Sequence, residues 1–117
     1  MSQQKKHLGM QGEEIAAKYL QQKGLVILDR NFRCRLGEID IITKHGDCLV
    51  FIEVKTRSSD RFGLGQESIT REKICKLRRL AQTYLAKRSF SGMNVRFDVV
   101  AVNSAREAKV THIENAF

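Results

Sequence analysis

Residues 37–57 read GEIDIITKHGDCLVFIEVKTR, which is two apolar stretches joined by a short polar turn. The stretches 38–44 and 48–55 are rich in isoleucine and valine, whose branched side chains favour strands. Between them, residues 45–47 read His-Gly-Asp, which is typical of a tight hairpin turn. This part of the chain therefore predicts two antiparallel strands joined by a short turn.

Acidic residues interrupt both of these apolar strands. Side chains alternate across a strand, so Glu38 and Asp40 should share one face of the first strand. The same alternation places Ile39 and Ile41 together on the opposite face. If the turn pairs the two strands, Asp40 approaches Glu53 of the second strand. The hairpin therefore predicts carboxylates lying close together in the sheet.

The flanking sequence predicts two helices and three further strands. Apolar residues recur at helical spacing over 9–23 and over 70–88. The remaining segments with a strand pattern are 25–32, 94–103 and, more briefly, 110–113.

The order of these elements predicts an α/β fold. The first three strands follow one another with short connections, including a basic turn over 33–37, and should form an antiparallel meander. A loop is expected over 56–66, after which Thr70 is a suitable N-cap for the second helix. That helix is long enough to cross over and bring the fourth strand into the same sheet in parallel. We therefore expect a small mixed sheet flanked by helices.

The chain has 117 residues, enough for one domain, and we expect that domain to span 1–117 with a flexible tail over 1–8. Its residues are 42% apolar and 29% charged, which excludes a fully disordered chain. The longest uncharged apolar runs, 25–28 and 48–52, are too short for a membrane helix. The polar N-terminus predicts no secretory signal.

The charge and the cysteines indicate a partner and a compartment. Lysine and arginine total 21 against 13 acids, for a net charge of +8, which suits a polyanion such as nucleic acid. The three cysteines, Cys34, Cys48 and Cys75, have no zinc-like spacing and are expected to pack among apolar neighbours. These features favour a reduced, cytoplasmic protein.

The acids of the hairpin predict chemistry as well as structure. Two nearby carboxylates repel unless a cation neutralises them, and Mg²⁺ favours carboxylates, waters and phosphate oxygens. Lys55 should share a face with Glu53, where it could orient or deprotonate a water molecule. Such a group fits phosphodiester hydrolysis. The spacing alone favours a solvated, ion-paired surface over a metal site, because acids and lysines often share an exposed strand face.

A series of short motifs narrows these alternatives. In chain order they are Gly12-Glu13, Arg30-Asn31-Phe32, Gly37-Glu38-Ile39-Asp40-Ile41-Ile42, Phe51-Ile52-Glu53-Val54-Lys55-Thr56-Arg57, Phe62-Gly63, Arg96-Phe97-Asp98-Val99-Val100 and His112-Ile113-Glu114-Asn115-Ala116-Phe117. The series resembles the YraN family of uncharacterised bacterial proteins. That family resembles a branch of the restriction-endonuclease-like, PD-(D/E)XK nuclease superfamily, with archaeal Holliday junction resolvases as functional relatives. The resemblance implies a restriction-endonuclease-like fold and a DNA endonuclease acting on branched or damaged DNA.

The resemblance also implies roles for particular residues. The superfamily's metal-binding aspartate falls on Asp40, its E-x-K element on Glu53 and Lys55, and its helix acid on Glu13. The carbonyl of Val54 would be a further metal ligand. The cofactor implied is Mg²⁺, for which Mn²⁺ substitutes. The proline of the superfamily's name is an isoleucine here, a departure that leaves the ligands intact.

Other residues have two interpretations each. Glu38 is either a supporting acid or an ordinary family marker. Gln66 and Lys73 either face the site or are polar surface groups. Asp98 is either a supporting acid or the partner of an arginine. Glu14, about 100° around the helix from Glu13, is expected to be a surface charge.

Basic side chains supply candidate phosphate contacts, significant only as a group: Arg33, Arg35, Arg57, Arg61, Lys76 and Arg79. The resemblance to resolvases further implies a homodimer, because a four-way junction has two-fold symmetry. Two other functions stay open: a non-catalytic nucleic-acid-binding module on a nuclease scaffold, and an assembly protein with an incidental charge excess.

Overall fold

The computed structural model describes residues 2–57, 70–88, 92–103 and 109–117, without the side chains of residues 2–10 and 57. In this part of the chain two helices and five strands follow one another as α1 (Ser2–Gln22), β1 (Val26–Cys34), β2 (Gly37–His45), β3 (Cys48–Arg57), α2 (Arg71–Arg88), β4 (Asn94–Asn103) and β5 (Lys109–Ile113).

The five strands form one mixed sheet in the order β1-β2-β3-β4-β5. Strands β1, β2 and β3 pair antiparallel, β3 and β4 pair parallel, and β5 pairs antiparallel with β4. The α/β class, the antiparallel meander and the parallel strand after a crossover helix are thus confirmed, and the architecture is consistent with a small nuclease-like fold.

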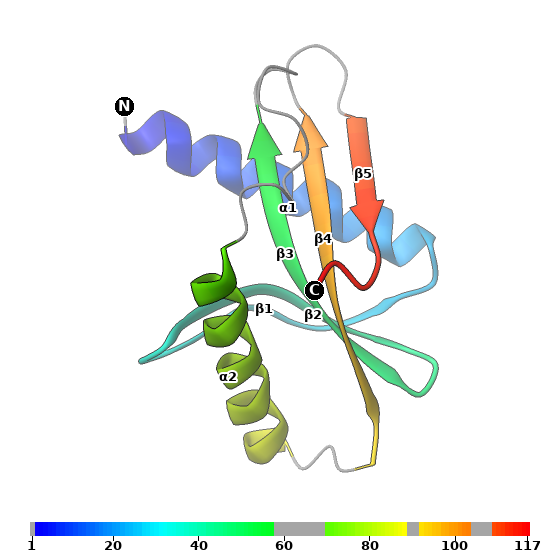
Figure 1. Ribbon diagram of the computed structural model, residues 1–117. Helices are drawn as coiled ribbons and strands as arrows, with labels where there is room; N and C mark the ends of the chain where they lie inside the picture. Colours follow the sequence, from blue (N-terminus) through cyan, green and yellow to red (C-terminus); the bar gives the residue numbers. More distant parts are fainter. Residues whose placement is uncertain (1, 58–69, 89–91, 104–108) are drawn as a thin grey trace.

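The two helices cover opposite faces of the sheet (Figure 1). On the α1 face, the core contains Ala16, Leu20, Val50, Ile52, Val100 and Val102. On the α2 face, it contains Ile42, Leu49, Phe51, Leu77, Leu80 and Tyr84. Adjacent residues of β3 therefore pack on different helices, as the period of two in a strand requires.

Strand β2 departs from simple alternation. Ile41 packs in the core cluster below α1, whereas Ile39 packs with Ile42 in the cluster below α2, so the expectation that Ile39 and Ile41 share a face was wrong. The change falls at Asp40, just beyond the last pair of the β2–β3 ladder, Ile41 and Ile52. Past that point the backbone of β2 pairs with β1 and no longer with β3, and the hairpin of β1 and β2 passes behind α2 (Figure 1).

Several boundaries differ from those predicted. Helix α1 begins at Ser2 rather than at residue 9, so residues 2–8, expected to be a flexible tail, are helical. They include glutamine, lysine and leucine, which are good helix formers, but they lack the apolar periodicity on which the prediction relied. The turn between β1 and β2 is also shorter than the predicted 33–37, since β1 reaches Cys34 and β2 starts at Gly37.

Helix α2 begins as predicted. The Thr70 hydroxyl oxygen accepts a hydrogen bond from the Lys73 N–H at 3.1 Å, which is the bond an N-cap makes. Cys75 on this helix is exposed, against the expectation that all three cysteines pack in apolar surroundings. It lies two residues before the buried Leu77, on the solvent side of the helix. Neither described helix is both long enough and apolar enough to cross a membrane.

Candidate metal and phosphodiester site

The site lies at the fork where β2 and β3 separate. The Asp40 carboxylate accepts a hydrogen bond from the Val54 N–H at 2.8 Å. A side-chain oxygen of β2 therefore satisfies a β3 amide beyond the last backbone pair of β2 and β3, Ile41 and Ile52. This contact fixes Asp40 beside the start of the Glu53-Val54-Lys55 segment.

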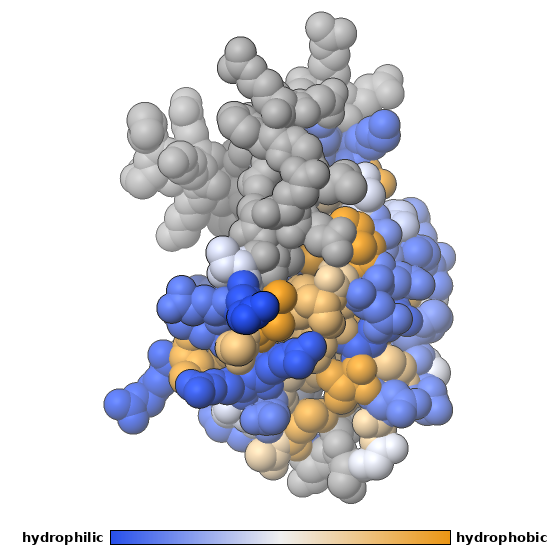
Figure 2. Space-filling model, in the orientation of Figure 1, coloured by the Kyte–Doolittle hydropathy of each residue, from blue (hydrophilic) through white to orange (hydrophobic). Residues whose placement is uncertain are grey.

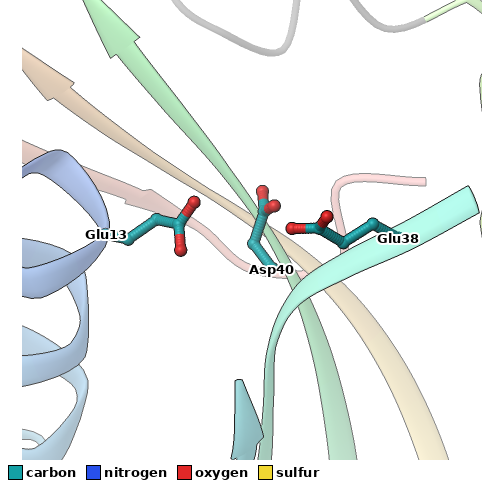
Figure 3. Close-up of side chains that lie close together, drawn as sticks. All are labelled: Glu13, Glu38 and Asp40. Atoms are coloured by element: carbon teal, nitrogen blue, oxygen red, sulfur yellow. The ribbon is translucent and has the colours of Figure 1, made fainter. Parts of the chain in front are cut away.

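Three carboxylates converge at the fork. Glu13 comes from α1, and Glu38 and Asp40 come from β2, with Asp40 between the other two (Figure 3). One oxygen from each lies within 4.8 Å of the others, a spacing that could hold a metal ion. Glu38 thus joins Asp40 and Glu13, whereas the sequence left Glu38 with two interpretations.

Gly12 allows α1 to bring Glu13 to this position. A Cβ atom at Gly12 would lie 2.0 Å from the hydroxyl oxygen of Thr56 on β3. Only glycine permits so close an approach of helix to strand. Gly12 therefore allows the close packing of α1 on β3, and this packing places the neighbouring Glu13 beside the other acids.

Burial and repulsion between neighbouring carboxylates disfavour the charged forms of Asp40 and Glu13. Burial, followed by the charges of Glu53, Glu13 and Glu38, raises the pKa of Asp40 to about 7 against the opposing Val54 hydrogen bond. Burial and the charge of Glu38 also raise the pKa of Glu13. Like charges held together in this way are typical of sites that bind an external partner or do chemistry.

Asn31 is a site residue to which the sequence assigned no role. With its amide nitrogen facing the acids, Asn31 donates to Glu13 at 3.0 Å and to Glu38 at 2.8 Å. Its φ of 56° lies in the left-handed region, which asparagine tolerates better than most residues. The only signal was its place in the Arg30-Asn31-Phe32 motif.

A basic pair faces the fourth acid. Glu53, 8% exposed, lies 2.6 Å from the Lys73 ammonium and 3.5 Å from that of Lys55. Burial, followed by the neighbouring Lys73, lowers the pKa of Lys55. Burial alone would lower the pKa of Lys73, but its hydrogen bonds to Glu53 and Lys55 raise it above the usual value. Of the two interpretations of Lys73, the structure thus supports the one in which it faces the site.

The remaining predicted residues are distributed around this centre. Arg33 donates twice to one oxygen of Glu38, from Nε at 3.0 Å and from Nη2 at 2.7 Å. The side chains of Arg35, Lys76 and Arg79 are exposed. The structure describes the backbone of Arg57 but not its side chain, and Arg61 and Gln66 lie outside the described residues.

Two further acids are accounted for by other contacts. Glu14 is exposed and pairs with Arg30 at 3.1 Å, as expected for a surface charge. Asp98 is fully buried and accepts hydrogen bonds from Arg96, from the His112 ring at 2.7 Å and from the Asn115 N–H at 3.1 Å. The hydrogen bonds from Arg96 support the interpretation of Asp98 as the partner of an arginine.

The fold and the site together define a small α/β protein with an acidic cluster flanked by lysines. Comparison with known proteins identifies the family to which it belongs. The model of the uncharacterised protein family UPF0102 matches residues 12–102, a range that includes Glu13, Asp40, Glu53 and Lys55. The chain belongs to this family, which confirms the resemblance to YraN proteins.

Individual relatives extend the likeness beyond that range. A UPF0102 protein of Pelotomaculum thermopropionicum is 50% identical over the whole length of both chains. One from Moorella thermoacetica is 48% identical over 97% of this chain and 95% of its own. One from Frankia casuarinae is 46% identical over 94% of this chain and 95% of its own.

Proposed function

We propose that this protein is a metal-dependent endonuclease that hydrolyses phosphodiester bonds in DNA, with branched or damaged DNA as the substrate. The observation that carries the proposal is the convergence of Glu13, Glu38 and Asp40 at one fork of the sheet. The charged pair of Glu53 and Lys55 flanks that fork from the next strand.

The donor set fits Mg²⁺, or Mn²⁺ in its place. Carboxylate oxygens are the ligands these ions prefer, and the raised pKa of Asp40 reflects negative charge that a cation would offset. Glu13 and Asp40 would hold the ion, and Glu38 is close enough to assist. Glu53, which lies against Lys55 and Lys73 outside this group of three, and the Val54 carbonyl are the further ligands that the family resemblance implies. When bound, the ion lowers the pKa of a water molecule and stabilises charge on the phosphate.

The lysines supply positive charge. Lys55, whose pKa is lowered by burial and by the neighbouring Lys73, lies beside Glu53, where its Nζ could orient the attacking water or balance charge on the phosphate. Lys73 keeps its proton, holds the Glu53 carboxylate and balances its charge. Asn31 orients Glu13 and Glu38 through its amide.

Exposed cations would bind the DNA backbone. Arg35 on the β1–β2 turn and Lys76 and Arg79 on α2 are free to contact phosphates, and the net charge of +8 favours such binding. On a four-way junction, two copies of the site related by two-fold symmetry would be needed, so a homodimer is part of this proposal.

A cleavage screen tests the proposal. Duplex, nicked, flap and four-way DNA would be incubated with the parent protein in Mg²⁺ and in Mn²⁺. We expect cleavage of at least one substrate, and a loss of about 100-fold or more in Asp40→Asn and in Glu53→Gln. Glu14→Gln is the matched control and should cleave like the parent.

A second measurement separates catalysis from folding. Titration calorimetry should detect Mn²⁺ binding to the parent that Asp40→Asn loses while its circular dichroism is unchanged. Equal cleavage by Asp40→Asn and the parent would refute the assignment. DNA binding without cleavage of any substrate would instead support a non-catalytic binding module on this scaffold.

A further inference from the structure

A pocket of about 300 Å³ adjoins the acidic cluster. It lies between the β1–β2 turn and the first turns of α2, and Glu38 of the cluster forms part of its wall. Lys73, which binds Glu53, lines it as well. The pocket thus shares Glu38 and Lys73 with the proposed site. Its volume is at the lower end of the range for small-ligand sites, about 300–1,000 Å³, so one compact group would fill it.

The lining of the pocket combines apolar side chains with charged side chains of both signs. Leu36, Leu77 and Leu80 supply apolar surface, and two acids and two lysines surround it: Glu38, Glu72, Lys73 and Lys76. Leu36 is one of the few large apolar side chains exposed among the described residues, at 37%. Figure 2 shows apolar residues set among hydrophilic ones on the face of the molecule that carries α2.

This chemistry matches a nucleobase better than a simple anion. The acids and lysines of the wall offer charges of both signs, so no excess of positive charge selects a phosphate. A base has two apolar faces, which the leucines could cover, and an edge bearing both donors and acceptors, which carboxylates and an ammonium group could bind. The backbone of the same nucleotide would then lie toward the exposed cations of α2 and the turn.

We propose that this pocket receives one unpaired nucleobase next to the bond that is cleaved. The inference rests on the proposed function and deepens it by naming the feature of DNA that is recognised. A base in a duplex must leave its stack to enter such a pocket, whereas a base at a fork or flap is already free. The protein should therefore prefer DNA with an unpaired nucleotide over fully paired DNA.

Binding measured without cleavage tests the inference. Fluorescence anisotropy in EDTA would compare a forked DNA carrying unpaired arms with a fully paired duplex of equal length. We expect the parent to bind the fork about tenfold more tightly. Lys76→Ala and Leu36→Ser should each reduce this preference to about twofold. Both residues are exposed, so neither variant should disturb the fold.

The control is Lys87→Ala, which removes the same charge from an exposed position near the far end of α2. It should weaken binding to both DNAs equally and keep the ratio. Equal affinity of the parent for the two DNAs, or the same ratio in Lys76→Ala as in Lys87→Ala and the parent, would overturn the inference.

The two proposals can fail separately. Asp40→Asn should keep the preference for forked DNA, because the pocket does not include Asp40. If the parent cleaves DNA but binds both probes equally, the pocket proposal is wrong and the nuclease proposal stands. If the parent prefers the fork through Lys76 and Leu36 but never cleaves, the nuclease proposal is wrong and the binding of an unpaired base by the pocket stands.

Discussion

Asp98 on β4 and Asp40 on β2 are aspartates in the same sheet, and the groups around them are opposite in kind. Asp98 is surrounded by the Arg96 guanidinium, the His112 ring and a backbone N–H. Burial alone would raise the pKa of Asp98, but these donors lower it below the usual value. Asp40 has one backbone donor, and three acids raise its pKa together with burial.

The difference separates a carboxylate with a structural role from one that we propose binds a metal ion. The chain supplies everything that Asp98 needs, so its charge stabilises the fold by joining β4 to β5 and the C-terminal residues. Lys55 and Lys73 pair with Glu53, and Arg33 pairs with Glu38, whereas no ion pair is formed by Asp40 among the described residues. The metal ion that we propose would supply the missing positive charge. Burial is therefore a weaker guide to function than the sign of the charges around the buried group.

The largest stability effect is expected at Asp98. Asp98→Asn removes the charge that pairs with Arg96 and the hydrogen-bond acceptor that His112 uses, leaving buried partners unsatisfied. We expect a loss of about 3–5 kcal/mol in the free energy of unfolding, measured by urea denaturation. Asp47→Asn in the exposed β2–β3 turn is the control, with an expected change within about 0.5 kcal/mol. A variant at Asp98 as stable as the parent would show that its network is dispensable.

Gly12 tests whether packing delivers the acid to the fork. In Gly12→Ala, the new Cβ would lie 2.0 Å from the Thr56 hydroxyl oxygen, so α1 must move away from β3. We expect a loss of about 1–3 kcal/mol in stability and weaker Mn²⁺ binding, since Glu13 moves with the helix. Urea denaturation and calorimetry measure the two effects.

The rescue is the double variant Gly12→Ala/Thr56→Ala. It removes the hydroxyl that lies closest to the added methyl group, and part of both losses should be recovered. If the double variant is no better than Gly12→Ala alone, the contact with Thr56 does not position Glu13.

The sequence predicted the parts of this molecule that depend on local patterns. The hairpin of β2 and β3 followed from branched residues around His45-Gly46-Asp47, and the bounds of β4 were predicted as observed. The start of α1 was missed because helix propensity without an apolar stripe leaves no periodic signal. The faces of β2 were missed because the departure at Asp40 depends on where its ladder with β3 ends.

The acids of the hairpin were predictable from the strand pattern, whereas the roles assigned to them and to Glu13 came from the family resemblance. Asp40, Glu53 and Lys55 lie in two adjacent strands, so the hairpin alone brought them into one region. Asn31 and Lys73 come from elements whose placement depends on tertiary packing, and no spacing in the sequence relates them to the acids. The contacts of Asp98 with His112 likewise need the pairing of β4 with β5.

The pH dependence of stability should distinguish the two aspartates. The pKa of Asp40 is raised to about 7 in the folded protein, so between about pH 4 and pH 7 the folded state holds a proton that the unfolded state has lost. Stability from this group is therefore present below pH 4 and is lost as the pH rises through 7. Because Asp40 is only partly buried, we expect a change on the order of 1 kcal/mol.

Urea denaturation of metal-free protein at pH 5 and pH 8 measures this change. Asp40→Asn should flatten the dependence, and Mn²⁺ should restore stability to the parent at pH 8. Asp98 has the opposite sign, since its lowered pKa makes its contribution disappear only as the pH falls below its usual value. A parent that gains stability from pH 5 to pH 8, with Asp40→Asn behaving identically, would contradict this view of Asp40.

The smallest effect is expected at Glu14, which can be compared with its neighbour Glu13 in the same turn of α1. Glu13 and Glu14 are neighbours on α1, but Glu14 is exposed and its partner is Arg30, whereas Glu13 faces Glu38 and Asp40. Glu14→Gln should change stability by no more than about 0.5 kcal/mol, because exposed ion pairs contribute little. It should bind Mn²⁺ like the parent, while Glu13→Gln weakens binding about tenfold or more. Equal losses in the two variants would mean that total charge on α1, rather than the position of one carboxylate, governs the metal.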